Sequence, residues 1–71
     1  MSAVEAWPLG TVVAATVYLE TETYERTATV IGHTPKRVRV RHASGRTMLA
    51  EPGELLDGRP ALWVDGDWWT R

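Results

Sequence analysis

Apolar and polar positions alternate most regularly in the middle of the chain, where residues 36–42 read KRVRVRH. In an extended strand, Val38 and Val40 share one face and the arginines share the other. A period of two residues predicts a β-strand that is buried on one side and exposed on the other. The arginines of the exposed face are Arg37, Arg39 and Arg41.

Shorter patterns on both sides of this segment predict further strands. Residues 11–20 are rich in β-branched side chains, and a second strand at 26–32 follows a polar, acidic loop at 21–25. Residues 46–50 come directly after a turn at 43–45, whose glycine can adopt a positive φ. The alternating segment is therefore expected to be the third of four consecutive strands.

The last third of the chain predicts one turn and one hairpin. Residues 53–56 suit a single 3₁₀ or helical turn, and Leu55 and Leu56 would then close one end of a barrel. Residues 61–70 suit a β-hairpin, because the Asp-Gly pair at 65–66 is a strong signal for a two-residue turn. No stretch carries an apolar stripe of helical spacing.

Together these segments predict an all-β fold, a small antiparallel barrel or sandwich of five or six strands. The chain has 71 residues, which is the size of one domain. We expect an N-terminal arm at 1–9 and a single domain at 10–71. The expected core consists of Val13, Val17, Leu19, Val30, Val38, Val40, Leu55 and at least one of Trp63 and Trp69.

The terminal hairpin places two neighbouring tryptophans, Trp68 and Trp69, on opposite faces. A two-residue turn at 65–66 pairs Trp63 with Trp68 and Leu62 with Trp69, so both faces are apolar. One interpretation buries one face in the core and covers the other with the N-terminal arm, through Trp7 and Leu9. The other leaves Trp63 and Trp68 as a contact surface for a partner or a second copy, with Trp7 beside them.

The amino-acid composition limits the kinds of functional site that the chain can form. The sequence has no cysteine, which excludes disulfides and cysteine-based zinc sites, and its two histidines are too few for a closed metal site. We therefore expect no metal and no cofactor, and we interpret His33 and His42 as surface residues. No nucleophile, base and orienting group stand at a defined spacing, so the sequence does not predict an enzyme.

The sequence also predicts no membrane segment. It has no run of about 18 apolar residues, and its first ten residues lack the basic and apolar regions of a signal peptide. The expected location is the cytoplasm.

The near-neutral net charge of −1 conceals a segregation of charges. The segment 36–46 has five basic residues and no acid, although a sequence pI of about 6.0 is low for a general nucleic-acid binder. A row of arginines along an extended strand can follow a nucleic-acid backbone. Alternatively, the same arginines pair with acids at Glu20, Glu22 or Glu25. The candidate nucleic-acid-binding residues are Lys36, Arg37, Arg39, Arg41 and Arg46.

Several of these stretches resemble SH3-like barrels of the Tudor and KOW kind. The similar segments are the opening strand at 10–14, the YERTATV segment at 24–30, the V-x-V strand at 38–40 and the P-x-x-L element at 52–55. The resemblance implies a five- to six-stranded SH3-like barrel. It also implies that an aromatic cage for methylated lysine or arginine could form from Tyr18, Tyr24 and a tryptophan.

We therefore expect a binding module without catalytic activity. The first hypothesis is nucleic-acid binding through the basic strand, with an aromatic side chain beside it. The alternative is a protein-interaction module that docks through Trp63 and Trp68 onto a partner protein or a second copy of itself. Small adaptors, inhibitors, subunits and accessory proteins of mobile elements are typically of this size.

Overall fold

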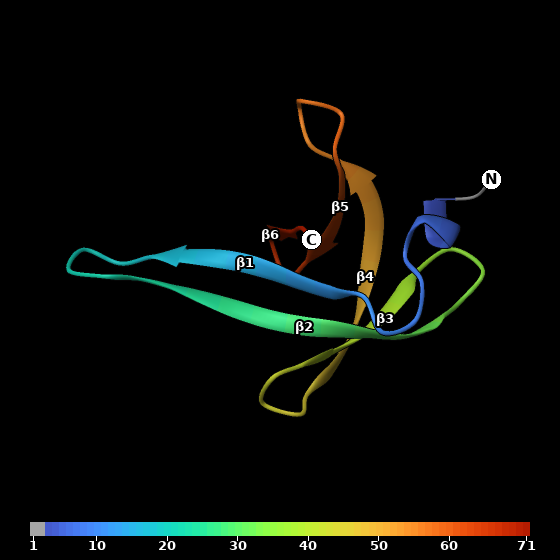
Figure 1. The fold of residues 1–71 in the computed structure, drawn as a ribbon, viewed down its shortest axis with the longest axis horizontal. Coiled ribbons are helices and arrows are strands. Elements are labelled where there is room, and N and C mark those ends of the chain that lie inside the picture. The colour runs from blue at the N-terminus through green and yellow to red at the C-terminus, as the bar shows by residue number, and fades with distance from the viewer. Residues whose placement is uncertain (1–2) are drawn as a thin grey trace.

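Six antiparallel strands and one 3₁₀ turn form the computed structural model, which describes residues 3–71 except for the side chains of residues 3, 4, 17 and 18 (Figure 1). The elements in chain order are η1 (Ala3–Ala6), β1 (Val12–Tyr18), β2 (Thr23–His33), β3 (Val38–His42), β4 (Thr47–Glu54), β5 (Pro60–Val64) and β6 (Asp67–Trp69). The all-β prediction is confirmed. In residues 3–71 no helix has the length and apolar character needed to cross a membrane.

The strands follow one another around a nearly closed barrel. Each strand pairs with the next in the order β1-β2-β3-β4-β5-β6, and every pairing is antiparallel. A bridge between Ala14 and Thr70 joins the two ends of the sheet, with N···O distances of 2.7 and 3.0 Å. The chain end therefore lies beside β1, and this one bridge brings the two edges of the sheet together.

One strand belongs to both halves of the barrel. The first half of β4, residues 47–50, pairs with β3, and its second half, residues 51–54, pairs with β5. Figure 1 shows β4 running across the direction of the long β1–β2 hairpin. This change of direction carries the terminal hairpin back toward β1.

The core is built from small strand residues around two indoles. Alternation along β3 buries Val38 and Val40, as the sequence predicts, and leaves the arginines outside. Alanine at several inward positions leaves room for the rings of Trp7 and Trp69, which are 1% and 2% exposed. The buried core residues are Trp7, Val13, Ala15, Ala28, Val30, Val38, Val40, Ala50, Ala61, Leu62, Val64 and Trp69.

Burial of Trp7 corrects one expectation, because the sequence pattern groups this residue with the exposed contact residues. The N-terminal segment folds over one end of the barrel, and the His33 Nε2–H donates a hydrogen bond to the Trp7 carbonyl oxygen. The Arg71 guanidinium lies 4.9 Å from the centre of the Trp7 ring and donates to the Ala6 carbonyl at 2.7 Å. These three contacts hold the N-terminal segment in place while the indole lies in the core.

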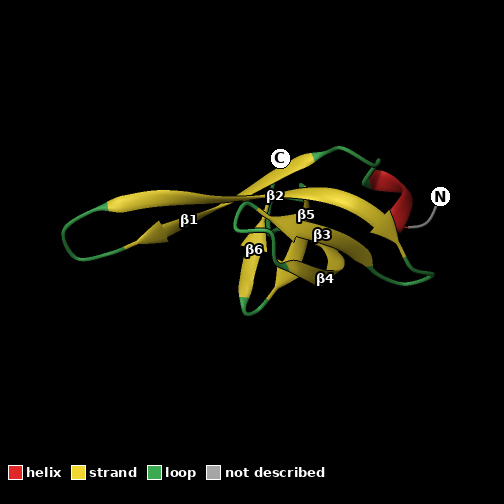
Figure 2. Ribbon diagram, turned by 90° about the horizontal axis from the view of Figure 1, so that it is seen from below, coloured by secondary structure: helices red, strands yellow, loops and turns green. Residues whose placement is uncertain are grey.

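The β1–β2 hairpin is longer than predicted. β2 begins at Thr23, inside the expected loop, because residues 23–25 pair with residues 16–18 of β1. Figures 1 and 2 both show the turn of this hairpin projecting beyond the other strands. Leu19 lies at its end and is 48% exposed, so its assignment to the core is wrong. The side chain of Val17 lies outside the described residues.

The predicted 3₁₀ turn at 53–56 is also wrong. β4 continues through Glu54, and a turn at residues 55–58 leads directly into β5, with a hydrogen bond from Leu55 N–H to the Arg59 carbonyl at 2.9 Å. Leu56 is fully exposed and Leu55 only half-buried, so neither closes the barrel. Among the described residues, the 3₁₀ turn lies at η1.

Candidate functional site

The terminal hairpin adopts the predicted register. Trp63 pairs with Trp68 and Leu62 with Trp69 across a two-residue turn. Asp65 has φ 48° and Gly66 has φ 85°, so both turn residues are left-handed. This is the type I′ geometry that matches the twist of the flanking strands, and an Asp-Gly pair adopts it at low cost.

The two faces of this hairpin have different environments. Leu62, Val64 and Trp69 face the core, whereas Trp63 and Trp68 face outward and are 39% and 41% exposed. The outward rings meet edge to face, with centroids 4.9 Å apart and an interplanar angle of 61°. The N-terminal arm does not cover them, since Trp7 is inside the barrel.

Further apolar side chains extend this exposed aromatic surface. Pro52 lies beside both indoles, and Leu55 and Leu56 lie on the other side of Trp68. We call the surface formed by Pro52, Leu55, Leu56, Trp63 and Trp68 the tryptophan patch. Its position depends on Gly53, because a Cβ at that residue would come within 3.0 Å of Cη2 of the Trp68 ring.

Carboxylates border the tryptophan patch. Glu51 lies next to Trp63 in the strand pairing, and Glu54 lies near Trp68. Arg37 approaches Glu51 at 3.6 Å, but both side chains are more than half exposed, so solvent screens the pair. Glu54 forms no ion pair within the described part of the chain.

A third carboxylate, Asp57, is held by its own loop. The Arg59 backbone N–H donates to its Oδ1 at 3.1 Å, and the Arg59 Nε–H donates to its Oδ2 at 2.7 Å. The backbone hydrogen bond is the main reason why the pKa of Asp57 lies below its usual value. Asp57 is therefore ionised at neutral pH, and its charge is paired with that of Arg59.

The predicted arginine surface is divided between three places. Arg39 and Arg41 face outward beside Ile31 and Leu49, whereas Arg37 is turned toward Glu51. Arg46 lies at the β3–β4 turn and lines a cavity at one end of the barrel. Lys36 is exposed in the turn before β3.

The alternative partners of these arginines are not engaged. None of the ion pairs among residues 3–71 joins a β3 arginine to Glu20, Glu22 or Glu25. Those acids lie in the turn and outer part of the projecting β1–β2 hairpin. Arg39 and Arg41 likewise form no ion pair with any described residue.

The aromatic cage implied by the Tudor resemblance is not assembled by the described side chains. Tyr24 is 47% exposed on the projecting hairpin and pairs with Val17, whereas the exposed indoles lie on β5 and β6. The aromatic pairs among the described residues are His42 with Trp69 and Trp63 with Trp68. The side chain of Tyr18 lies outside the described residues.

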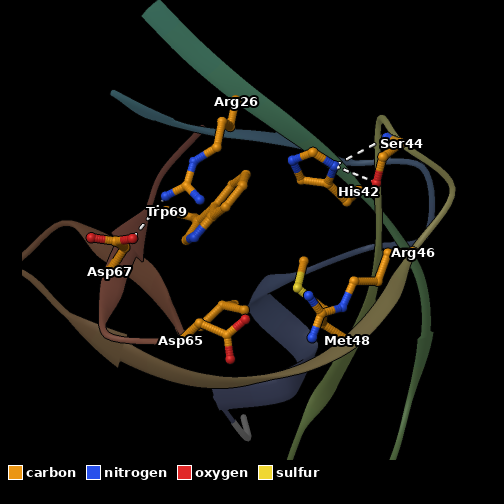
Figure 3. Close-up of a pocket in the computed structure, with 9 residues that line it drawn as sticks. Arg26, His42, Ser44, Arg46, Met48, Asp65, Asp67 and Trp69 are labelled. Carbon is orange, nitrogen blue, oxygen red and sulfur yellow. Dashed lines mark hydrogen bonds and ion pairs between the residues drawn. The ribbon is translucent and has the colours of Figure 1, made fainter. Parts of the chain in front are cut away.

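A second site lies at one end of the barrel, and sequence reasoning missed it. Figure 3 shows Arg26 of β2, His42 of β3, the β3–β4 turn and the β5–β6 turn around a cavity. We call it the end cavity, and its volume is ≈230 Å³. Arg26 lies over the Trp69 ring at 5.3 Å and donates to Asp67 at 2.7 Å. These two ion-pair partners are 41 residues apart, so no local pattern points to their contact. The residues lining the end cavity are Arg26, His42, Ser44, Arg46, Met48, Val64, Asp65, Asp67 and Trp69.

The two histidines have different positions. His33 is exposed, as expected, and its ring is bonded to the Trp7 carbonyl. His42 is half-buried and lines the end cavity, with its ring edge-on to Trp69 at a centroid distance of 6.1 Å. Within residues 3–71, no group of three or more His, Asp or Glu side chains is placed to hold a metal ion.

The fold and these surfaces define a small, nearly closed antiparallel barrel with a partly exposed tryptophan pair on its terminal hairpin. Comparisons of this chain with protein families, with curated proteins and with solved structures found no match.

Proposed function

We propose that this chain is a non-enzymatic protein-interaction module that docks through the tryptophan patch. The observation that carries the proposal is the outward pair Trp63 and Trp68, each about two-fifths exposed and packed edge to face. Interfaces are enriched in tryptophan, and clustered aromatic side chains supply most of the energy of many complexes. A rigid, preformed pair loses little conformational entropy when it binds.

The charges around the patch indicate the chemistry of the partner. Glu51 and Glu54 border the exposed indoles, and the face of an indole attracts cations. A complementary protein segment would place an apolar side chain against Trp68 and a lysine or arginine between the ring faces and the carboxylates. The proposed partner is therefore a basic protein segment with an exposed apolar anchor.

Selection from a random peptide display library tests this proposal, because it samples many candidate partner sequences at once. We expect the enriched peptides to combine an apolar residue with lysine or arginine. Trp68→Ala should weaken binding of such a peptide by about 2 kcal/mol, which is roughly thirtyfold in affinity. Calorimetric titration of the purified chain with the synthetic peptide measures this change.

Tyr24→Ala is the matched control, since it removes an aromatic side chain of similar exposure from the projecting hairpin. It should leave the affinity within a factor of about two of the parent value. Glu54→Gln should weaken binding of basic peptides only modestly, because the carboxylate lies at the rim. Enriched peptides that bind Trp63→Ala and Trp68→Ala as tightly as the parent would refute the proposal.

Nucleic-acid binding is the second candidate, and one specific observation favours it. Arg39 and Arg41 project from the same face of β3, exposed and without an ion pair to any residue in 3–71. Arg37 lies near Glu51 and Arg46 lines the end cavity, so this footprint is short. Binding by two arginines would give a log–log salt slope of only about −1.4 for a single strand.

The two candidate functions, peptide binding and nucleic-acid binding, should change in opposite ways in the same two variants. Arg39→Ala should weaken binding of a single-stranded oligonucleotide and leave peptide binding unchanged, whereas Trp68→Ala should do the reverse. The finer assignment to the SH3-like barrels of the Tudor and KOW kind is also a proposal. The antiparallel order of the strands supports it, and the continuous strand at the position of the expected 3₁₀ turn counts against it. We also propose that the protein is located in the cytoplasm.

A further inference from the structure

Two residues that line the end cavity each have a buried hydrogen-bond donor without an acceptor. Trp69 is only 2% exposed, yet its indole Nε1–H has no hydrogen-bond partner among the described residues. The Arg26 Nε–H is also buried and unpartnered within residues 3–71, although the terminal nitrogen of the same guanidinium is bonded to Asp67. Buried polar groups are nearly always paired in folded proteins, so two unpaired donors beside one cavity need an explanation.

His42 adds a third donor, because its tautomer is fixed by its neighbour. The backbone N–H of Ser44 donates to Nδ1 of His42 at 3.0 Å, and the Ser44 hydroxyl lies 2.9 Å from the same nitrogen. Nδ1 must therefore carry a lone pair, and the neutral ring carries its proton on Nε2. Figure 3 shows Ser44 on one side of the imidazole and the cavity on the other.

Arg46 provides a positive charge on the opposite wall. Its guanidinium lines the end cavity and forms no ion pair with any residue that the structure describes. Asp67 is already engaged by Arg26, and Asp65 stands at the β5–β6 turn. The Arg46 guanidinium and the His42 Nε2–H thus favour a negatively charged acceptor, and a single charge keeps its repulsion by the two aspartates small.

The remaining walls are apolar, which indicates that the rest of the ligand is apolar as well. Met48, Val64 and the face of the Trp69 indole line the cavity between the polar groups. Its volume of ≈230 Å³ accommodates a small organic molecule rather than a single water. We propose that the end cavity binds a small carboxylate with an apolar body. The carboxylate accepts from the Arg46 guanidinium and the His42 Nε2–H, and the body lies against Met48, Val64 and the Trp69 ring.

Benzoate is the probe that tests this inference, and the indole N–H of Trp69 is the reporter. In proton–nitrogen correlation spectra of the full chain, the assigned Trp69 indole resonance should shift saturably with added benzoate. Benzyl alcohol has the same body without the charge, and phosphate has charge without the body. Both should shift the resonance far less at equal concentration. An unmoved Trp69 resonance, or an equal response to benzyl alcohol, would overturn the inference.

Substitutions that change the charge at the cavity mouth test whether the cavity prefers an anion. Arg46→Gln should weaken benzoate binding about tenfold, because it removes a charge-assisted hydrogen bond. Arg39→Gln makes the same change on the outer face and should have no effect. Asp65→Asn should strengthen binding roughly threefold, because it removes a negative charge that repels the carboxylate. The turn should be kept, because asparagine also tolerates the left-handed conformation. Equal weakening by both arginine variants would show non-specific attraction and contradict a built site.

This site is separate from the tryptophan patch, so the two proposals can fail independently. Trp68→Ala should weaken peptide docking roughly thirtyfold and leave the benzoate-induced shift of Trp69 intact. Loss of the shift in that variant, with the fold retained, would refute the separation of the two sites.

Discussion

Trp68 and Trp69 are neighbours in sequence, yet their indoles have opposite environments. The first is 41% exposed and packs against Trp63, whereas the second is 2% exposed and lies beneath the guanidinium of Arg26. Both sit on β6, a strand of three residues, so the difference comes from the alternation of side chains across a strand. The comparison shows that a single residue of register separates a core position from an exposed position.

The strand next to the hairpin decides which face is buried. Within the hairpin alone, both faces are apolar, so its own sequence does not choose between them. In β4, Glu51 lies opposite Trp63 and Pro52 lies opposite Leu62. Burial of the Trp63 face would bury the Glu51 carboxylate as well, and an unpaired buried charge is costly. The polar residue on β4 therefore directs Trp63 and Trp68 outward.

The largest effect that separates the two tryptophans is on stability. Trp69→Ala should lower the free energy of unfolding by about 3–5 kcal/mol, because it leaves a cavity where a buried indole packed. The total stability of a chain of this size is only about 4–11 kcal/mol. The variant should therefore lose a large fraction of the parent's stability, and urea denaturation followed by circular dichroism measures the loss.

Trp68→Ala is the matched control for this comparison. Its ring is partly in solvent, so its removal should lower the free energy of unfolding by only about 1–1.5 kcal/mol. The same substitution is expected to remove most peptide binding. Equal losses of stability from the two variants would contradict the assignment of one indole to the core and the other to the patch.

The sequence predicts well those features that depend on local periodicity and turn chemistry. Alternation around Val38 and Val40 identifies the buried face of β3, and the Asp-Gly pair fixes the register of the terminal hairpin. Both signals are contained within short segments of the chain. For this reason the strands and the hairpin could be predicted, along with the outward direction of Arg39.

Features that depend on distant contacts could not be predicted. Pro52 and Gly53 look like turn residues, and only pairing with β5 shows that they lie within β4. Trp7 enters the core because alanines on other strands leave room for it, and the end cavity joins Arg26 to Asp67 across 41 residues. Leu19 looks like a core residue by periodicity, but it lies where the hairpin projects beyond the barrel.

A moderate loss of stability is expected from substitutions in the β5–β6 turn, which keeps the two faces of the hairpin in register. Gly66 has φ 85°, a conformation that costs a residue with a Cβ about 1–2 kcal/mol. Gly66→Ala should therefore destabilise the chain by that amount, and thermal unfolding measures the change. Gly66→Asn should be milder, since asparagine tolerates left-handed backbone. Unchanged stability in Gly66→Ala would argue against the type I′ turn and the register it sets.

A smaller effect is expected where the patch rests on β4. A Cβ at Gly53 would lie 3.0 Å from Cη2 and 3.1 Å from Cζ3 of the Trp68 ring. Because this ring is partly in solvent, it can shift by a few tenths of an ångström, and Gly53→Ala should change stability by less than about 1 kcal/mol. The indole resonances of Trp68 and Trp63 should move in nitrogen correlation spectra while that of Trp69 stays in place. A comparable shift of Trp69 would show that the two faces are not independent.

The smallest effect concerns the loop that carries Leu55 and Leu56 beside the patch. The Arg59 backbone N–H bonds the carboxylate of Asp57 and holds its pKa below the usual value, so the folded loop favours the ionised form. This contribution to stability is present above the usual carboxyl pKa and is lost as pH falls through the lower, folded pKa. Carbon-detected titration should place the Asp57 midpoint below that of the same residue in the urea-unfolded chain. Asp57→Asn should remove this acid-dependent loosening of the loop and leave the Trp69 face unaffected. A midpoint for Asp57 at or above its unfolded value would mean that the loop is not fixed by Arg59, and Leu55 and Leu56 would then no longer be a preformed part of the docking surface.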